Sequence, residues 1–228
     1  FNAAHRLIEK AVRSNMQSVF TDCPHREKLG WLEQVHLNGP GLLYNYDLTA
    51  YAPQIMQNMV DAQHSNGAMP TTAPEYVIFE GPGMDAFAES PEWGGSLVIF
   101  PFMYYETYGD DSLIKKYYPN MRRYVDYLKT RADKGILSFG LGDWYDYGDF
   151  RPGFSRNTPV PLVATAHFYM TVMYLVQAAK MVGNDFDTRY YTSLAQDIMA
   201  AFNKYFLHKD TAQYGTGSQC SNALPLFL

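Results

Sequence analysis

The feature that most constrains the fold is a helical period in the apolar residues, which returns in six long segments. In each segment apolar side chains recur every three or four residues, so they would form one stripe along a helix. These segments are residues 3–16, 47–63, 97–108, 112–130, 159–181 and 185–206. Pro119 lies inside the fourth, so we expect a kink or break near Tyr118. We expect an all-α fold of about seven or eight helices, paired in an α/α architecture.

Two long connections, residues 66–91 and 133–158, separate these helices. Loops of this length in a compact domain are usually functional or disordered. Both are rich in aromatic and acidic residues, a composition that argues against disorder. We therefore expect the long loops to form one working face, and no linker divides the chain.

The amino-acid composition limits the kinds of ligand and partner that the protein is expected to bind. The 228 residues are 47% apolar, enough for one large core or two small ones, and 16% aromatic with 19 Tyr and 3 Trp. Tyr and Trp suit amphipathic ligands such as sugars, although core packing explains many of them equally well. The net charge of −5 without a basic cluster argues against a nucleic-acid partner, and no apolar run approaches the length of a membrane span. Cys23 and Cys220 have no metal-binding spacing, so Cys23 is expected to be a packed free thiol, and no metal or cofactor is expected.

The densest cluster of reactive residues is the segment 21–34, Thr-Asp-Cys-Pro-His-Arg-Glu-Lys-Leu-Gly-Trp-Leu-Glu-Gln. Asp22 and Glu27 could act as a carboxylate pair, with Arg26 keeping Asp22 ionised while Glu27 stays protonated as a general acid. The alternative is a capping aspartate with a surface Arg–Glu pair. Trp31 follows Glu27 by four residues, which on a helix puts both on one face.

The other two tryptophans have similar neighbours. Glu92-Trp93 opens a helix after the first long loop, and Asp143-Trp144-Tyr145-Asp146 lies in the second loop between glycines. Tryptophans beside carboxylates suit ring stacking with hydroxyl recognition, so we expect at least two of the three to contact a ligand. An Asp-rich loop can also bind Ca²⁺, but this one lacks the dense spacing of a calcium loop.

Residues 22–31 resemble the signature of the α-L-rhamnosidases of glycoside hydrolase family 78. Residues 91–94, 141–148, 158–166 and 221–224 look like later segments of the same family, in the same order, so the resemblance covers most of the chain. It implies an (α/α)6 barrel and an inverting hydrolase that removes terminal α-linked L-rhamnose from glycans or glycosides.

The resemblance also implies roles for individual residues. Glu27 would be the general acid, and the other sites would bind the rhamnose-containing substrate. The substrate-binding residues would be Asp22, Arg26, Trp31, Gln34, Trp93, Asp143, Trp144 and Asp146.

Two departures from the family pattern matter. Many members carry an aspartate three residues after the motif tryptophan, where this chain has Gln34; the adjacent Glu33 would point about 100° away on a regular helix, so it is not an automatic replacement. The family's general base is a glutamate far downstream of the acid, and nothing here can be assigned that role. We therefore expect residues 1–228 to be a single segment of a catalytic barrel domain, truncated at both ends and inactive alone. Its partners would be the remaining domains of the same polypeptide, and a secreted or periplasmic location is favoured over a cytoplasmic one.

Two other functions stay open. One is another α/α-barrel glycosidase, acting on a different deoxy-sugar or a uronic acid, which the Gln34 departure allows. The other is a non-catalytic carbohydrate-binding protein on a hydrolase scaffold.

Overall fold

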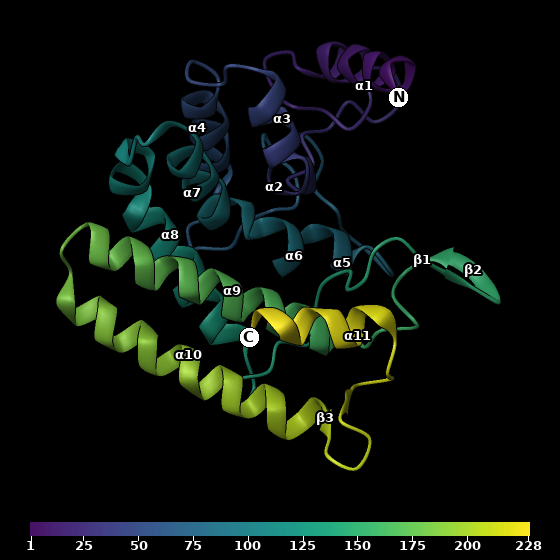
Figure 1. Cartoon of the computed structure of the whole chain (residues 1–228), viewed down its shortest axis with the longest axis vertical. Coiled ribbons are helices and arrows are strands. Elements are labelled where there is room, and N and C mark those ends of the chain that lie inside the picture. Colours follow the sequence, from purple (N-terminus) through teal and green to yellow (C-terminus); the bar gives the residue numbers. More distant parts are fainter.

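The structure, a computed structural model, describes the backbone of residues 1–228 and every side chain except that of Phe227. All six expected long helices are present (Figure 1). They are α1 (Asn2–Asn15), α4 (Ala52–Ala62), α7 (Ser96–Tyr108), α8 (Ser112–Arg131), α9 (Val160–Met181) and α10 (Asp185–Phe206). The expected helical fold is therefore confirmed.

The sequence pattern missed the short elements. They are α2 (Glu33–Leu37), α3 (Gly39–Asn45), α5 (Asp85–Ala88), α6 (Pro91–Gly94), α11 (Gln219–Ala223) and the 3₁₀ helix η1 (Leu224–Phe227). Two small antiparallel hairpins complete the fold: β1 (Asp146–Gly148) pairs with β2 (Phe150–Gly153), and β3 (Leu207–His208) pairs with β4 (Gln213–Tyr214). Segments of five residues or so are too short for a 3.6-residue period to register.

Helix α9 is the centre of the packing. It lies beside α10 (Figure 1) and also contacts α8, α7 and α6. By length and composition alone α9 could cross a membrane, but most of its apolar stretch is buried in the protein. A core helix covered by neighbours on several sides is apolar around its whole circumference, which explains that composition.

Helix α8 corrects one expectation, because it runs unbroken from Ser112 to Arg131 with Pro119 inside it. The proline removes the hydrogen bond to the carbonyl of Lys115, an exposed residue whose carbonyl water can reach. Tertiary contacts hold the same region, since the Tyr118 hydroxyl donates to Asp187 Oδ2 on α10 at 2.6 Å. A break near Tyr118 is therefore excluded, and the alternative expectation of a kink stays a prediction.

Helix α1 has the expected bounds but not the expected burial. Leu7 and Ile8 of its apolar stripe are 69% and 62% exposed, whereas Val12 and Met16 pack against the core. No residue of α1 is fully buried. The period thus predicted the helix correctly without predicting how much of the stripe is covered.

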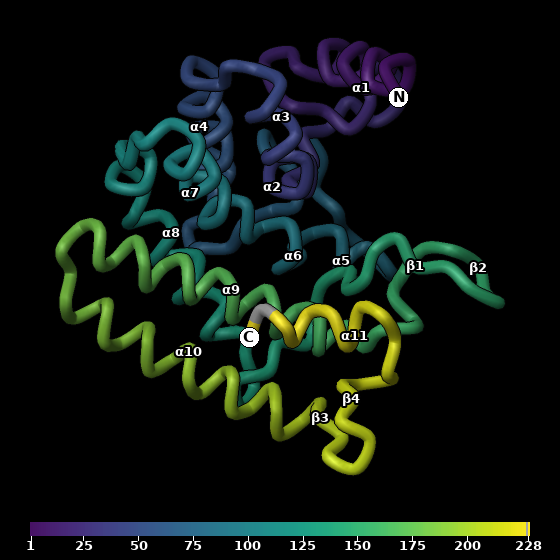
Figure 2. The backbone as a smooth tube through the Cα atoms, in the orientation of Figure 1, coloured from purple at the N-terminus to yellow at the C-terminus, as the bar shows by residue number. Residues whose placement is uncertain are grey.

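The two long loops meet at one side of the helices, where the backbone can be followed in Figure 2. Phe87, near the end of the first loop, packs edge-on against Trp144 and Phe154 of the second, with ring centroids 5.3 and 5.5 Å apart. This contact brings together the segments in which the candidate residues lie.

Candidate active site

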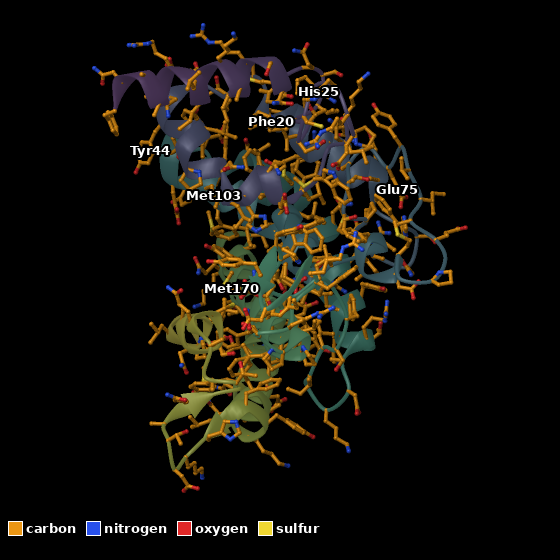
Figure 3. The ribbon with its side chains drawn as sticks, turned by 90° about the vertical axis from the view of Figure 1, so that its right-hand side faces the viewer. Phe20, His25, Tyr44, Glu75, Met103 and Met170 are labelled. Carbon is orange, nitrogen blue, oxygen red and sulfur yellow. The ribbon has the colours of Figure 1, made fainter. Side chains whose placement is uncertain are left out.

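Residues 22–29 form a closed turn rather than the start of a helix. The Asp22 amide donates to the Leu29 carbonyl at 3.1 Å, and the Leu29 amide donates to Asp22 Oδ1 at 3.2 Å. Lys28 has a left-handed φ of 58°, which a helix would not allow. The helical placement expected for Glu27 and Trp31 was therefore wrong. Figure 3 labels His25 of this turn, on the same side of the view as Glu75 of the first long loop.

The segment after the turn is extended and pairs with the first long loop. Trp31 forms an antiparallel bridge with Thr72, and the Ala73 amide donates to the Gly30 carbonyl at 2.9 Å. A Cβ on Gly30 would lie 2.4 Å from the Ala73 carbonyl oxygen. Glycine is required here because the two backbones approach so closely.

Glu27 and Trp31 meet despite the absence of a helix. The Trp31 indole Nε1–H donates to Glu27 Oε2 at 2.8 Å. The Glu27 amide donates to the sulfur of Cys23, a buried free thiol as expected, at 3.2 Å. These contacts fix an otherwise exposed carboxyl at the edge of a cavity.

That cavity has a volume of about 410 Å³, and we call it the Glu27 cavity. Its lining residues are Asp22, Glu27, Trp31, Glu33, Phe79, Met84, Phe87, Trp93 and Trp144. The structure thus brings all three tryptophans together with Asp22 and Glu27, as the sequence indicated. Glu33, Phe79, Met84 and Phe87 were missed, although the aromatic composition of the first long loop was a signal that pointed to Phe79 and Phe87.

The aromatic side chains form a continuous wall. Trp31 packs edge-on against Trp93, with ring centroids 5.3 Å apart, and stacks on Phe79 at 5.1 Å and an interplanar angle of 23°. Phe87 joins this group to Trp144. Flat rings that pack against one another are held rigidly, so they can present a preformed surface to a ligand.

Adjacent residues Glu33 and Gln34 face different cavities. Glu33 lines the Glu27 cavity, whereas Gln34 lines a separate cavity of about 460 Å³ beside α1 and α3. Burial raises the pKa of Glu33; the hydrogen bond from Gln34 opposes that shift, and the charges of Asp22 and Glu27 add to it. The family pattern places an aspartate at position 34. In this chain the carboxyl group that lines the Glu27 cavity is that of the neighbouring Glu33, whereas Gln34 lines the other cavity.

Three other predicted site residues lie outside the Glu27 cavity. Arg26 is exposed and forms no ion pair with Asp22 in the described part of the chain. Asp143 and Asp146 line another cavity, of about 850 Å³, bounded by the β1–β2 region and residues 216–223. Their binding of substrate stays a prediction.

Asp146 uses its oxygens within the fold. Oδ1 accepts from the Tyr147 amide and the Asn157 side chain, and Oδ2 accepts from the amides of Arg156 and Asn157, all between 2.6 and 2.9 Å. Burial by itself would raise the pKa of Asp146, but these hydrogen bonds lower it below the ordinary value. The carboxylate thereby ties strand β1 to the following loop.

Glu92 joins the helix that carries Trp93 to the loop that carries Trp144. It is 5% exposed; Oε1 accepts from the Gly142 amide at 3.2 Å, and Oε2 accepts from the Ser90 hydroxyl, which in turn accepts from the Leu141 amide. Burial raises its pKa, while His167 and the hydrogen bonds oppose that shift. Glu92 therefore sets the relative position of two walls of the Glu27 cavity.

The histidine within the helical packing has a structural role. His36 is buried, its Nδ1 lies 2.6 Å from the Ser96 hydroxyl, and burial together with His167 lowers its pKa to about 4. Among the described residues, no group of three or more His, Cys, Asp or Glu side chains is arranged to hold a metal ion.

Known proteins with similar sequences are α-L-rhamnosidases. The whole chain, residues 1–228, matches the family described as the bacterial alpha-L-rhamnosidase six-hairpin glycosidase domain. An α-L-rhamnosidase of Formosa agariphila is 30% identical over 220 residues, covering 91% of this chain and 22% of that protein. One from Streptomyces avermitilis is 30% identical over 212 residues, covering 92% and 19%. The chain thus spans about a fifth of the length of these relatives.

Solved structures agree with the sequence comparison. The α-L-rhamnosidase from Dictyoglumus thermophilum superposes with a TM-score of 0.85 at 30% identity, covering 99% of this chain and 25% of that one. The Streptomyces avermitilis α-L-rhamnosidase complexed with L-rhamnose superposes with a TM-score of 0.84 at 27% identity, covering 99% and 20%. The expected fold, part of a six-hairpin barrel, is confirmed.

Proposed function

We propose that the whole protein is an α-L-rhamnosidase, because this chain belongs to the bacterial α-L-rhamnosidase six-hairpin glycosidase domain family. Its reaction is the removal of terminal α-linked L-rhamnose from a glycan or glycoside with inversion at the anomeric carbon. Glu27 is the general acid, and Asp22, Trp31, Trp93 and Trp144 bind the sugar. The observation that carries this proposal is the Glu27 carboxyl, held by Trp31 at the edge of a cavity lined by all three tryptophans.

The lining of the Glu27 cavity supports a neutral deoxy-sugar. It contains three carboxyl groups, which can accept hydrogen bonds from hydroxyl groups, and no cation among the residues described. Phe79, Met84 and Phe87 supply an apolar wall against which a methyl group, such as that of a 6-deoxyhexose, can pack. A uronic acid would bring its own carboxylate beside these carboxyl groups without a cation to compensate it, which is unfavourable. This argues against the uronic-acid alternative.

The acid acts through a defined atom. Since Glu27 Oε2 accepts the indole hydrogen bond, Oε1 is the atom available to hold the proton. From there the proton passes to the glycosidic oxygen as the bond to the anomeric carbon breaks, so the departing group leaves as a neutral alcohol. Water activated by a base on the opposite face of the sugar completes an inverting reaction, which needs the two carboxyl groups about 6.5–9.5 Å apart. We assign that base to a residue outside this chain, so residues 1–228 alone are expected to be inactive.

The decisive experiment is Glu27→Gln in the whole protein, assayed on two aryl α-L-rhamnosides. One has a good leaving group, 4-nitrophenol, and the other a poor one, 4-methoxyphenol. General acid catalysis contributes about 10²–10⁴-fold, and mostly where the leaving group needs protonation. The variant should therefore lose far more kcat on the poor leaving group, and NMR of the first product should show β-L-rhamnose in the wild type.

Glu80→Gln is the matched control, because Glu80 is exposed next to Phe79 but does not line the cavity. It should keep wild-type kcat on both substrates. Near-normal turnover of the 4-methoxyphenyl rhamnoside by Glu27→Gln would remove the acid assignment. Sugar binding without turnover by the wild type would favour a non-catalytic carbohydrate-binding protein instead.

A further inference from the structure

Glu33 has one carboxylate oxygen held by the protein and one that is not. Oε1 accepts a hydrogen bond from the Gln34 side-chain amide at 2.8 Å. Among the residues whose side chains are described, none donates to Oε2. The residue nevertheless lines the Glu27 cavity and is only partly exposed. A solvent-accessible carboxylate oxygen without a protein donor can accept a hydrogen bond from a ligand.

The held oxygen is part of a short chain of side-chain amides. The Asn38 Nδ2 group donates to Gln34 Oε1 at 3.0 Å, which orients the Gln34 amide so that its nitrogen faces Glu33. A residue with only acceptor atoms at position 34 could not make this bond to a carboxylate. Although Gln34 lines a different cavity, its side-chain amide therefore orients the carboxylate of Glu33.

The surroundings of Glu33 favour a ligand that donates hydrogen bonds. Its neighbours in the Glu27 cavity are the carboxyl groups of Asp22 and Glu27, and no cation among the described lining residues would compensate a further anion. The remaining walls are aromatic or apolar. A sugar hydroxyl is a neutral donor, so it can meet Oε2 without adding charge, and hydrogen bonds to a carboxylate are stronger than those between neutral groups.

We propose that Glu33 is a specificity-determining residue of the Glu27 cavity: its Oε2 accepts a hydrogen bond from one ring hydroxyl of the bound sugar, and Gln34 and Asn38 orient it. This inference rests on the proposed function, since it assumes that the Glu27 cavity binds the sugar that is cleaved.

Asp146 is a useful comparison, because all of its hydrogen bonds in the described residues are made within its own loop. Both of its oxygens accept hydrogen bonds from the backbone or from Asn157. Glu33 differs in that one of its two oxygens has no donor among the described residues, while the residue lines the Glu27 cavity. The difference separates a ligand-binding role from a structural one.

The test measures kcat/KM of the whole protein on a 4-nitrophenyl α-L-rhamnoside and on its 2-, 3- and 4-deoxy analogues. In the wild type, removal of the hydroxyl that Glu33 accepts should lower kcat/KM by about 10- to 100-fold, as expected for a hydrogen bond to a charged group. Glu33→Ala should lower kcat/KM by a similar factor on the parent rhamnoside. On that one deoxy analogue Glu33→Ala should match the wild type within about threefold, because the bond is already absent.

Three variants complete the design. Glu33→Gln keeps the shape and an acceptor oxygen, so it should recover part of the loss. Gln34→Ala should lose a smaller factor than Glu33→Ala but with the same pattern across the analogues. Glu80→Ala removes an equal charge beside the cavity and should behave as the wild type. Circular dichroism checks that each variant is folded.

The outcomes separate the two proposals. If the wild type cleaves the rhamnoside and Glu33→Ala loses the same factor on every analogue, or loses nothing, Glu33 contacts no hydroxyl and this inference alone fails. If the wild type cleaves no α-L-rhamnoside, the proposed function fails and takes this inference with it. Loss in Glu80→Ala equal to that in Glu33→Ala would show a general effect of charge, and would also overturn the inference.

Discussion

Two regions of this protein have similar amino-acid composition but differ in how many hydrogen bonds their carboxylates accept from the protein. Residues 22–33, the Glu27 turn, and residues 140–158, the Asp146 loop, each combine carboxylates, glycine and a tryptophan. In the Glu27 turn the carboxylates line a cavity with few internal hydrogen bonds. In the Asp146 loop the central carboxylate is consumed by four hydrogen bonds within the loop.

The difference lies in where donors for the carboxylates come from. Asp146 finds amide groups about ten residues away on its own loop, since the chain folds back at the β1–β2 hairpin. Glu27 and Glu33 each accept from a single side-chain donor, and the other oxygen of each has no donor among the described residues. Carboxylates that are satisfied internally hold structure, and those left partly unsatisfied beside a cavity are candidates for chemistry.

The largest effect should come from Glu92, which connects the two sides of this comparison. Glu92→Ala leaves the Ser90 hydroxyl and the Gly142 amide without their buried acceptor, and we expect a loss of about 3–5 kcal/mol in stability. Hydrogen exchange of residues 140–146 in the folded protein measures the local part of this loss. Unchanged protection there would mean that Glu92 does not anchor the Asp146 loop.

Glu92 also predicts a pH dependence. Because burial raises its pKa, the folded protein holds this proton more tightly than the unfolded chain does. The resulting stability is complete below the ordinary value of 4.5 and is lost as pH rises through the folded pKa, by about 1.4 kcal/mol per unit. Glu92→Gln should abolish that decline, which urea unfolding of both proteins at several pH values will detect.

Gly30 tests whether the Glu27 turn depends on its backbone pairing. In Gly30→Ala the new Cβ would lie 2.4 Å from the Ala73 carbonyl oxygen, so the two segments must separate. We expect a loss of about 2–3 kcal/mol, with lower activity because Trp31 moves away from Glu27. Gly41→Ala is the control, since nothing lies within 4 Å of a Cβ there and alanine favours helix α3. Equal stability changes in the two variants would contradict the close-approach argument.

Replacing Asp22 or Asp146 by alanine should have opposite effects on stability and activity. The stability changes are the smallest predicted here. Asp146→Ala should cost about 2 kcal/mol and change kcat/KM little beyond that due to loosening of the loop. Asp22→Ala removes a single bond, to the Leu29 amide, and should cost under about 1 kcal/mol while lowering kcat/KM about 100-fold. Thermal unfolding and rhamnoside kinetics on both variants decide it: a reversed pattern would make Asp146 the sugar ligand.

Much of the fold followed from local patterns. The six long helices can be predicted from the sequence because a 3.6-residue period extends over at least three turns. The break expected at Pro119 is absent because a contact with α10 stabilises α8 next to the proline. The residues of the site were predicted only in part, because Asp22, Glu27 and the three tryptophans line one cavity whereas Arg26, Gln34, Asp143 and Asp146 lie outside it. Trp31, Trp93 and Trp144 do line one cavity, while the helix assumed for Glu27 and Trp31 is a turn followed by an extended segment.

By itself the sequence determined the helices, the loops that meet, and the family whose motif it carries. Only the tertiary structure decided which carboxylates stay partly unpaired, that Glu33 rather than Gln34 lines the cavity of Glu27, and that Phe79 and Phe87 complete the aromatic wall. The physical reason is distance along the chain. A helical period is set by neighbours within four residues, whereas hydrogen-bond partners and cavity walls come from segments such as 22–33, 72–87 and 140–144, which meet only after the helices have packed.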